Sequence, residues 1–258
     1  MVHSVHDPWN WHLLAALVRR DFKAQYRRSL IGPAWALLYS VIYLLLFIAI
    51  RSFLGIPSDG KPYAIFAAVA IVPWTFFSGA VARAGTSIML NGQLLKKMAV
   101  RREILPTAAI ILSFVDFAVA SIIVIGLAFW FGLTIGWSIL LLPIFVLLLA
   151  VCALGIGMMV ASIGVYKRDI ILGLPFVLQI WMLASPIMYP LSIVPVEWRL
   201  AYSLNPMVGI LEAFRSILLD GALPDLQLSL MAVAGCGLLL LVGWTMFKTL
   251  SQYFVDVL

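Results

Sequence analysis

Long apolar runs, separated by short polar connections, cover most of the chain. A helix needs about 20 mainly apolar residues to cross the hydrocarbon core of a membrane. Six segments meet this requirement, and each is predicted to be a transmembrane helix. They are Ala34–Ile50, Tyr63–Ala82, Ala108–Phe131, Ile139–Val165, Ile170–Tyr189 and Leu226–Phe247. We therefore expect an all-α integral membrane protein whose residues 34–258 form a six-span transmembrane domain.

The residues before the first span predict an amphipathic helix. One side of its helical wheel carries Leu13, Leu14, Leu17, Val18, Phe22 and Tyr26, and the opposite side carries Arg19, Arg20, Lys23 and Arg27. We expect residues 1–33 to form a cytoplasmic interface helix with its apolar side in the acyl boundary and its basic side toward anionic headgroups. This helix would act as a membrane-surface anchor or would also contact a cytoplasmic partner.

The segment 185–220 is apolar but is not expected to be another span. Four prolines interrupt it, namely Pro186, Pro190, Pro195 and Pro206. It also carries four charged residues, Glu197, Arg199, Glu212 and Arg215. Irregular backbone is tolerated at membrane depth only where protein or a water-filled cavity shields it. The pattern therefore predicts short re-entrant helices on the external side, between the fifth and sixth spans.

Composition and charge support the membrane interpretation and give the chain an orientation. The chain is 64% hydrophobic and 11% charged, with a mean hydropathy of +1.10, which excludes an ordinary water-soluble domain. Of its 17 Lys and Arg residues, all but Arg51, Lys61, Arg199 and Arg215 lie on the side of the N-terminus in the six-span arrangement. Both termini are therefore expected in the cytoplasm, and the net charge of +6 reflects topology rather than nucleic-acid binding. No cleavable signal peptide is expected.

The sequence offers no pattern typical of a catalytic or metal site. Residues 55–61 match the spacing of a phosphate-binding loop, but Pro62 replaces the Ser or Thr that binds magnesium. The motif also needs a strand before it, and here it lies in a predicted external loop between two spans, away from cytoplasmic ATP. His3, His6 and His12 are too few and too close to the N-terminus to predict a metal site. Cys152 and Cys236 lie in apolar runs and are expected to be small buried side chains rather than a disulfide. We therefore expect a non-enzymatic chain without its own ATPase site.

Asp116 is an acidic residue inside the third predicted span. A carboxylate at this depth costs about 2.5–3.5 kcal/mol on insertion scales, so it should face the helix bundle or a cavity. Two interpretations remain open. Asp116 would line a pore or subunit contact, or it would be a structural residue hydrogen-bonded to Ser113 or Ser121.

Aromatic residues recur every four positions in the first span, at Trp35, Tyr39, Tyr43 and Phe47. They share one broad side of the helix, and the tyrosine hydroxyls at membrane depth need polar partners. One interpretation is a path on which sugar rings stack, with Gln179 and Trp181 of the fifth span as further candidates. The alternative is aromatic packing between helices.

The segment 91–106 between the second and third spans predicts a short basic helix. Its candidate contact residues are Leu94, Leu95, Lys96, Lys97, Arg101, Arg102 and Glu103. The segment would be a positively charged cytoplasmic loop only, or it would dock on a cytoplasmic partner.

Five stretches resemble one known family. They are LVRRDFKAQYRRSLIGPAWALL (17–38), IVPWTFFSGAVAR (71–83), VYKRDI (165–170), SPIMYP (185–190) and LNPMVGILEAFRSIL (204–218). In this order and spacing they resemble the membrane subunit of ABC exporters for lipid-linked polysaccharides, of the O-antigen and teichoic-acid type. The resemblance runs over almost the full length of the chain.

The resemblance implies a half-transporter of the bacterial inner membrane. Two copies would form a homodimer around a channel, and two separate cytoplasmic ABC ATPase subunits would bind ATP and Mg, so that this chain needs no cofactor. The segment 91–106 would couple to the ATPase, and the first-span aromatics would line the glycan path. An external lid would contain Pro186, Tyr189, Pro190, Asn205, Pro206, Glu212 and Arg215.

Other functions remain compatible with the sequence. The same fold would serve an exporter of teichoic acid, capsule, a small lipid or a drug. An intramembrane transferase is a further alternative, and it would require a catalytic carboxylate pair at the membrane interface.

Overall fold

A computed structural model describes residues 11–27, 29–97, 101–134 and 136–254, and this part of the chain is helical, with no strand. The long helices are α2 (Ala34–Leu54), α3 (Tyr63–Leu90), α5 (Ile104–Trp130), α6 (Leu142–Gly164), α7 (Arg168–Leu183) and α10 (Leu226–Ser251). Shorter elements are α1 (Trp11–Tyr26), α4 (Gly92–Lys97), η1 (Trp137–Leu141), η2 (Leu191–Ile193), α8 (Val196–Tyr202) and α9 (Pro206–Leu219). The predicted all-α membrane fold is confirmed.

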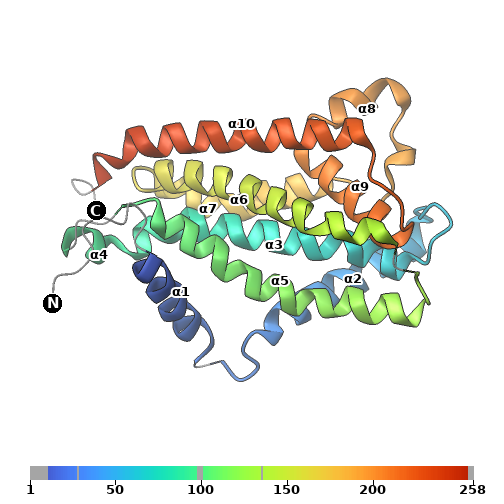
Figure 1. The fold of residues 1–258 in the computed structure, drawn as a ribbon, viewed down its shortest axis with the longest axis horizontal. Helices are drawn as coiled ribbons and strands as arrows, with labels where there is room; N and C mark the ends of the chain where they lie inside the picture. Colours follow the sequence, from blue (N-terminus) through green and yellow to red (C-terminus); the bar gives the residue numbers. More distant parts are fainter. Residues whose placement is uncertain (1–10, 28, 98–100, 135, 255–258) are drawn as a thin grey trace.

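The long helices lie side by side along the longest axis of the molecule (Figure 1). The start of α1, the end of α10 and the whole of α4 gather at one end of the bundle. The connections from α2 to α3 and from α9 to α10 lie at the other end. We call these the α4 end and the far end. This arrangement is the one expected of an even number of crossings.

Five described helices are long and apolar enough to cross a membrane by themselves, namely α2, α3, α5, α10 and the continuous η1–α6 unit. The remaining predicted span, the fifth, is α7, which ends at Leu183 instead of Tyr189 and contains 16 residues, which correspond to about 24 Å at 1.5 Å per residue. The hydrocarbon core is about 30 Å thick. A turn and the short helices η2 and α8 follow α7 before the chain enters α9.

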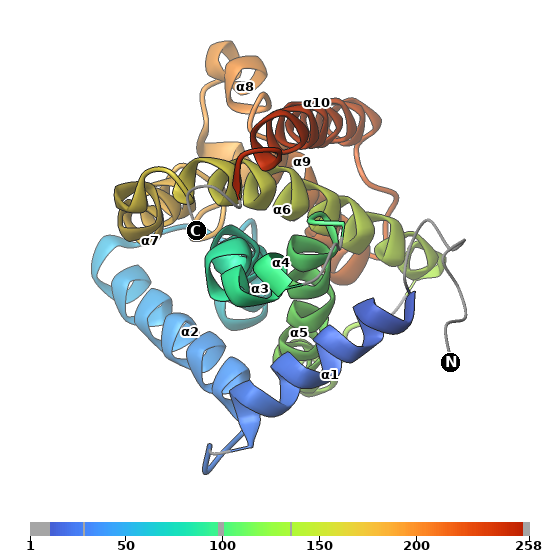
Figure 2. The same cartoon turned by 90° about the vertical axis from the view of Figure 1, so that its left-hand side faces the viewer.

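Helix α3 is the axis of the bundle. In its most apolar stretch 78% of the residues are buried, compared with 17% in α2 and in α10. It packs against α5, α6, α2 and α9, and Figure 2 shows it enclosed when the molecule is viewed from the α4 end. The helix also extends to Leu90, beyond the predicted end at Ala82, so that Arg83 lies inside it and not in a connection.

Helices α6 and α10 touch through their backbones. A Cβ atom on Gly243 would lie 2.1 Å from the carbonyl oxygen of Gly155, and one on Gly155 would lie 2.7 Å from the backbone of Leu239. Membrane helices attract one another mainly by close packing, which small residues permit. The glycine pair therefore fixes the separation of these two helices.

Helix α9 shows that the region 185–220 is not a loose external loop. Most of its side chains are buried, and it packs against α3, α6 and α10. Short helices between the last two long helices were expected, and η2, α8 and α9 are found there. The preceding helix α8, by contrast, contains no buried residue and projects from the far end of the bundle (Figure 1).

Replacement of Gly243 by Ala should destabilise the protein. The new methyl group would collide with backbone, which is more rigid than a side chain, and overpacking of this kind costs about 1–3 kcal/mol. Gly237 of the same helix has no atom within 4 Å of a built Cβ, so Gly237→Ala serves as the matched control. Thermal melting of the detergent-purified chain should show a lower midpoint for Gly243→Ala and no loss for Gly237→Ala. Equal melting of the two variants would contradict the proposed close contact.

Candidate functional site

A polar pocket lies between α2, α3 and α5, within the bundle. Its volume is about 290 Å³, and it is lined by Ala36, Tyr39, Tyr43, Thr75, Phe76, Ser78, Gly79, Arg83, Ser113 and Asp116. Three of these residues, Tyr39, Tyr43 and Asp116, were singled out from the sequence without any sign that they meet. The structure brings them to one cavity at membrane depth.

An ion pair stands on the wall of this pocket. The Arg83 guanidinium binds the Asp116 carboxylate, and its Nη1 donates to Ser113 Oγ at 2.9 Å. The two charged side chains are 28% and 18% exposed, so much of the solvation of each charge is replaced by its partner. The expected hydrogen bond from Ser113 or Ser121 to Asp116 is not the one found, because Ser121 donates to the Phe117 carbonyl.

Helix α1 reaches the same ion pair. The Tyr26 hydroxyl donates to the second oxygen of the Asp116 carboxylate. Burial raises the pKa of Tyr26, and the hydrogen bond to Asp116 and the charge of Asp116 raise it further. The phenol therefore keeps its proton and remains a donor throughout the physiological pH range. The last turn of α1 is in this way attached to the pocket wall.

Sequence reasoning did not identify Arg83 as a functional residue, because the second span was expected to end at Ala82. The relevant signal was Asp116, since a carboxylate inside the membrane calls for a basic partner at similar depth. Arg83 is the basic residue that follows the second apolar run directly. A single sequence does not show that the two helices are neighbours.

The aromatic residues of α2 do not share one environment. Trp35 and Tyr39 are 46% and 58% exposed, whereas Phe47 is only 2% exposed and belongs to the core. Tyr43 is half-buried at the pocket and contacts Phe47, with ring centroids 6.2 Å apart. The stripe therefore passes from an exposed surface through the pocket into the core. Its role as a substrate path stays a prediction.

The two candidates on α7 lie apart from this pocket. Gln179 is exposed. Trp181 is half-buried, meets the Phe77 ring edge-on at 5.3 Å, and donates from Nε1 to Asn205 Oδ1 at 3.0 Å. Asn205 also accepts from the backbone N–H of Met207 and so caps α9. Trp181 thus joins α7 to the predicted lid.

The α4 end of the molecule combines an apolar underside with a basic surface. Leu14, Leu17 and Leu95 are buried in one cluster, so the apolar side of α1 packs largely on protein and not in the acyl boundary as expected. Among the predicted contact residues, Arg19, Arg20, Lys23, Arg27, Lys96 and Arg101 are exposed, and Leu94, Arg102 and Glu103 are half-buried. Lys97 ends α4, and residues 98–100 lie outside the described part.

Helix α1 is tied to α4 as well as to the pocket. Arg20 Nη2 donates to Asn91 Oδ1 at 2.6 Å, and Asn91 Nδ2 donates to the Ser87 carbonyl at 2.8 Å. Asn91 is the residue between α3 and α4. A displacement of α4 would therefore act directly on α1, whose last turn contacts Asp116.

The far end is organised around Arg215, which is 4% exposed. Its guanidinium bonds Glu212 at 2.8 Å, the Ile187 carbonyl at 3.1 Å and the Tyr189 carbonyl at 3.4 Å, and lies 3.8 Å from the centre of the Phe66 ring. The other predicted lid residues fall into two groups: Pro186, Pro190 and Pro206 are buried, and Tyr189, Asn205 and Glu212 are half-buried. The re-entrant segment is therefore held to α3 by a buried cation.

The loop with the spacing of a phosphate-binding motif is a connection between α2 and α3. Gly55 and Gly60 adopt positive φ angles of 63° and 75°. Lys61 forms an ion pair with Asp220 at 2.6 Å and donates to the Leu219 carbonyl at 3.1 Å. The lysine thus fastens this connection to the end of α9.

Within the described residues no group of three or more His, Cys, Asp and Glu side chains is placed to hold a metal ion. His3 and His6 lie outside the described part. Cys152 and Cys236 are buried free thiols, as predicted.

Replacement of Asp116 by Leu should destabilise the chain by leaving Arg83 without its counter-charge. Removal of one partner of a buried pair costs about 3–5 kcal/mol, and the partial exposure of this pair points to the lower value. The double variant Arg83→Leu/Asp116→Leu should recover most of the loss, because it leaves no isolated charge. Asp21→Leu, which breaks the exposed pair with Arg20, is the control and should change stability by about 1 kcal/mol or less. A thermal melt that ranks the double variant below Asp116→Leu would contradict this account of the pocket.

Comparison with known proteins assigns the chain to a family. The family model described as ABC-2 type transporter matches residues 12–219. The O-antigen export system permease protein RfbA of Myxococcus xanthus is 29% identical over 261 residues, covering 99% of each chain. Two proteins of the same description from Klebsiella pneumoniae are 23% and 22% identical, each over 95% of both chains. The matched region runs from the first turn of α1 to the end of α9 and so contains the pocket and its ion pair, and the chain belongs to the ABC-2 type transporter family of membrane proteins.

Proposed function

We propose that this chain is the membrane subunit of an ABC transporter that exports a lipid-linked polysaccharide of the O-antigen type across the bacterial inner membrane. Three relatives described as O-antigen export permeases align with it over nearly their whole length. The observation that carries the proposal beyond these names is the pocket that joins Tyr39 and Tyr43 to the Arg83–Asp116 pair. Such a surface suits a hydroxyl-rich polymer better than a hydrophobic drug.

The physical problem of this transport is desolvation. A glycan carries many hydroxyl groups, and each polar group left without a partner in hydrocarbon costs several kcal/mol. Tyrosine rings offer a flat apolar face together with a hydroxyl, and the serine and threonine side chains of the pocket add further partners. This wall can accept a sequence of sugar units without binding any one of them strongly.

We infer that the complete conduit requires a second copy of the chain. A pocket of about 290 Å³ is too small to enclose a polymer. Tyr39 of α2 and Gln179 of α7 are polar and exposed on this chain, and polar side chains at membrane depth are expected to face protein or water rather than lipid. A homodimer that encloses these surfaces would satisfy both requirements.

We infer the orientation of the chain in the membrane, and the place where energy is supplied, from the basic surface of the α4 end. It carries the exposed basic residues of α1 and α4, so we place it and both termini in the cytoplasm. We propose that two separate ABC ATPase subunits dock there and bind ATP and Mg. Movement of α4 would pass through Asn91 and Arg20 to α1, and through Tyr26 to Asp116 in the pocket wall.

Tyr39→Ala and Tyr43→Ala should reduce glycan export several-fold while the complex with the ATPase still assembles. Both changes remove a ring and a hydroxyl from the conduit wall. Leu45→Ala, on the same helix at a side chain that is 61% exposed, is the control and should export normally. Export is measured as surface glycan in cells, and assembly by co-purification. Normal export by an assembled Tyr39→Ala/Tyr43→Ala transporter would remove these residues from the path.

Tyr26→Phe should uncouple ATP hydrolysis from export. The change deletes one hydroxyl and preserves the ring, so α1 loses its bond to Asp116 but keeps its packing. Reconstituted transporter should hydrolyse ATP at a near-normal rate while exporting several-fold less glycan per ATP. Tyr253→Phe, at a phenol that is 58% exposed, is the matched control. An unchanged ratio of glycan to ATP would exclude Tyr26 from coupling.

A further inference from the structure

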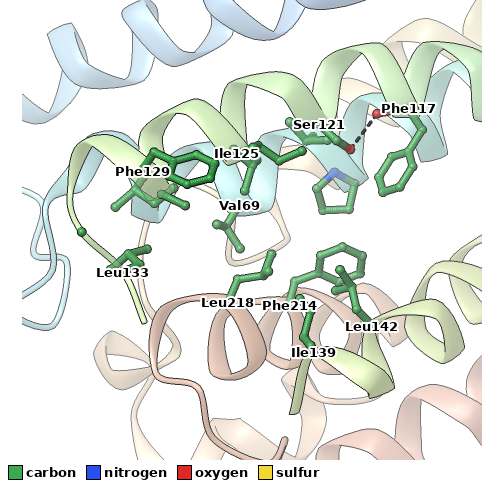
Figure 3. A pocket seen from close by; sticks show the side chains of 16 residues that line it. Val69, Phe117, Ser121, Ile125, Phe129, Leu133, Ile139, Leu142, Phe214 and Leu218 are labelled. Atoms are coloured by element: carbon green, nitrogen blue, oxygen red, sulfur yellow. Dashed lines mark hydrogen bonds between the residues drawn. The ribbon is translucent and has the colours of Figure 1, made fainter. Parts of the chain in front are cut away.

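A second cavity shares no lining residue with the polar pocket. It has a volume of about 360 Å³ and is bounded by α3, α5, α9 and the η1–α6 segment (Figure 3). Its lining comprises Ile65, Val69, Val72, Pro73, Phe117, Ser121, Val124, Ile125, Ala128, Phe129, Gly132, Leu133, Ile139, Leu142, Phe214 and Leu218. In Figure 3 the side chains of α5 face those of α9 across the space.

The chemistry of this lining selects an apolar occupant. Ser121 carries the one hydroxyl group among the lining side chains, and this hydroxyl already donates to the Phe117 carbonyl at 2.7 Å. A bound water needs two to four polar partners. The cavity does not offer them, so hydrocarbon fits it better than water.

The position of the cavity along the membrane normal is marked by two tryptophans. Trp130 at the end of α5 and Trp137 at the start of η1 are 84% and 89% exposed. Exposed tryptophans of membrane proteins concentrate at the membrane–water interface. On α5 the lining runs from Phe129, next to this interface, to Phe117. The twelve steps between these two residues cover about 18 Å, and half of the hydrocarbon core is about 15 Å. The cavity therefore extends through one leaflet, from the interface to the middle of the bilayer.

The cavity is open on the side of α5. Ile125 and Phe129 line it and yet are 55% and 83% exposed. A hydrocarbon chain that enters between Ile125 and Phe129 remains at the depth of the surrounding lipid tails. It would fill the space that separates α5 from Phe214 and Leu218 of α9.

We propose that this cavity binds one acyl chain of a membrane phospholipid from the leaflet at the far end, which is the outer leaflet in the orientation proposed above. The length of the cavity matches one leaflet, and bulk phospholipid is the hydrocarbon present at that depth. The polar pocket is lined by α2, α3 and α5 and shares no residue with this cavity, so the site is separate from the candidate substrate path. The bound chain acts as a wedge between α5 and α9, and this role does not depend on which substrate crosses the membrane.

The test is photolabelling of the full transporter, purified with its ATPase and reconstituted in vesicles of phosphatidylethanolamine and phosphatidylglycerol. A trace of phospholipid carries a photoactivatable group in the middle of one acyl chain. Peptide mapping should find label in residues 117–133 and 214–218 at several times the level found in the exposed face of α10.

Two substitutions on α5 give the matched comparison. Ala128 is half-buried and lines the cavity, whereas Ala118 is exposed and lies outside it. Ala128→Trp should fill the cavity and lower the labelling several-fold, and Ala118→Trp should leave it unchanged. Thermal melting checks that each variant is folded, and Ser121→Phe replaces Ala128→Trp if the latter does not fold.

Four results would overturn the proposal. One is an even distribution of label over all exposed membrane faces. Another is undiminished label in a folded cavity-filling variant. The third is selective displacement of the label by added polyprenyl phosphate, which would assign the cavity to a lipid anchor of the substrate. Absence of label from residues 117–133 in the assembled transporter also contradicts it, because a second copy of the chain would then cover the opening.

Discussion

Water is absent from the hydrocarbon core of a membrane, so every polar group placed there must find its partner in protein or in a water-filled path. This constraint accounts for the positions of the charged residues in the bundle. Arg83 and Asp116 neutralise each other between α3 and α5. Arg215 pairs with a glutamate, two carbonyl groups and an aromatic ring, which replace much of the water it has lost, and its Nε has no hydrogen-bond partner among the described residues. Both arginines thereby attach other elements to α3, which is the most deeply buried helix.

The same requirement makes the polar pocket conspicuous. Structural hydrogen bonds explain Ser113 and Asp116, but they do not explain a cavity that also gathers two tyrosines, a threonine and a further serine at membrane depth. Unfilled space lined by polar groups is unfavourable in hydrocarbon unless water or a substrate enters it. The polar groups of the pocket are therefore better explained by a transport role than by the stability of the fold.

The sequence predicted much of this architecture, since twenty-residue apolar runs and the distribution of Lys and Arg follow directly from the thickness and polarity of a bilayer. The sequence predicted the long helices and the short helices before α10, and the structure contains them. Asp116 was recognised from the sequence as a residue that needs a polar partner. Its actual partners, Arg83 and Tyr26, lie 33 and 90 positions away. Periodicity within one helix does not report which helices become neighbours. For the same reason Phe47 could not be distinguished from Tyr43, although one is in the core and the other at the pocket.

The contact between Gly155 and Gly243 has a consequence for motion. Where two helices meet backbone to backbone, each glycine forms a notch that receives the other chain, and sliding by even one residue would drive a side chain into that notch. Helices α6 and α10 are thus fixed in register, and we expect them to move as one rigid unit. A membrane protein that must open and close around its cargo needs such a stationary reference. Its moving parts are then to be sought on the other side of α3, among α1 and α2 (Figure 2).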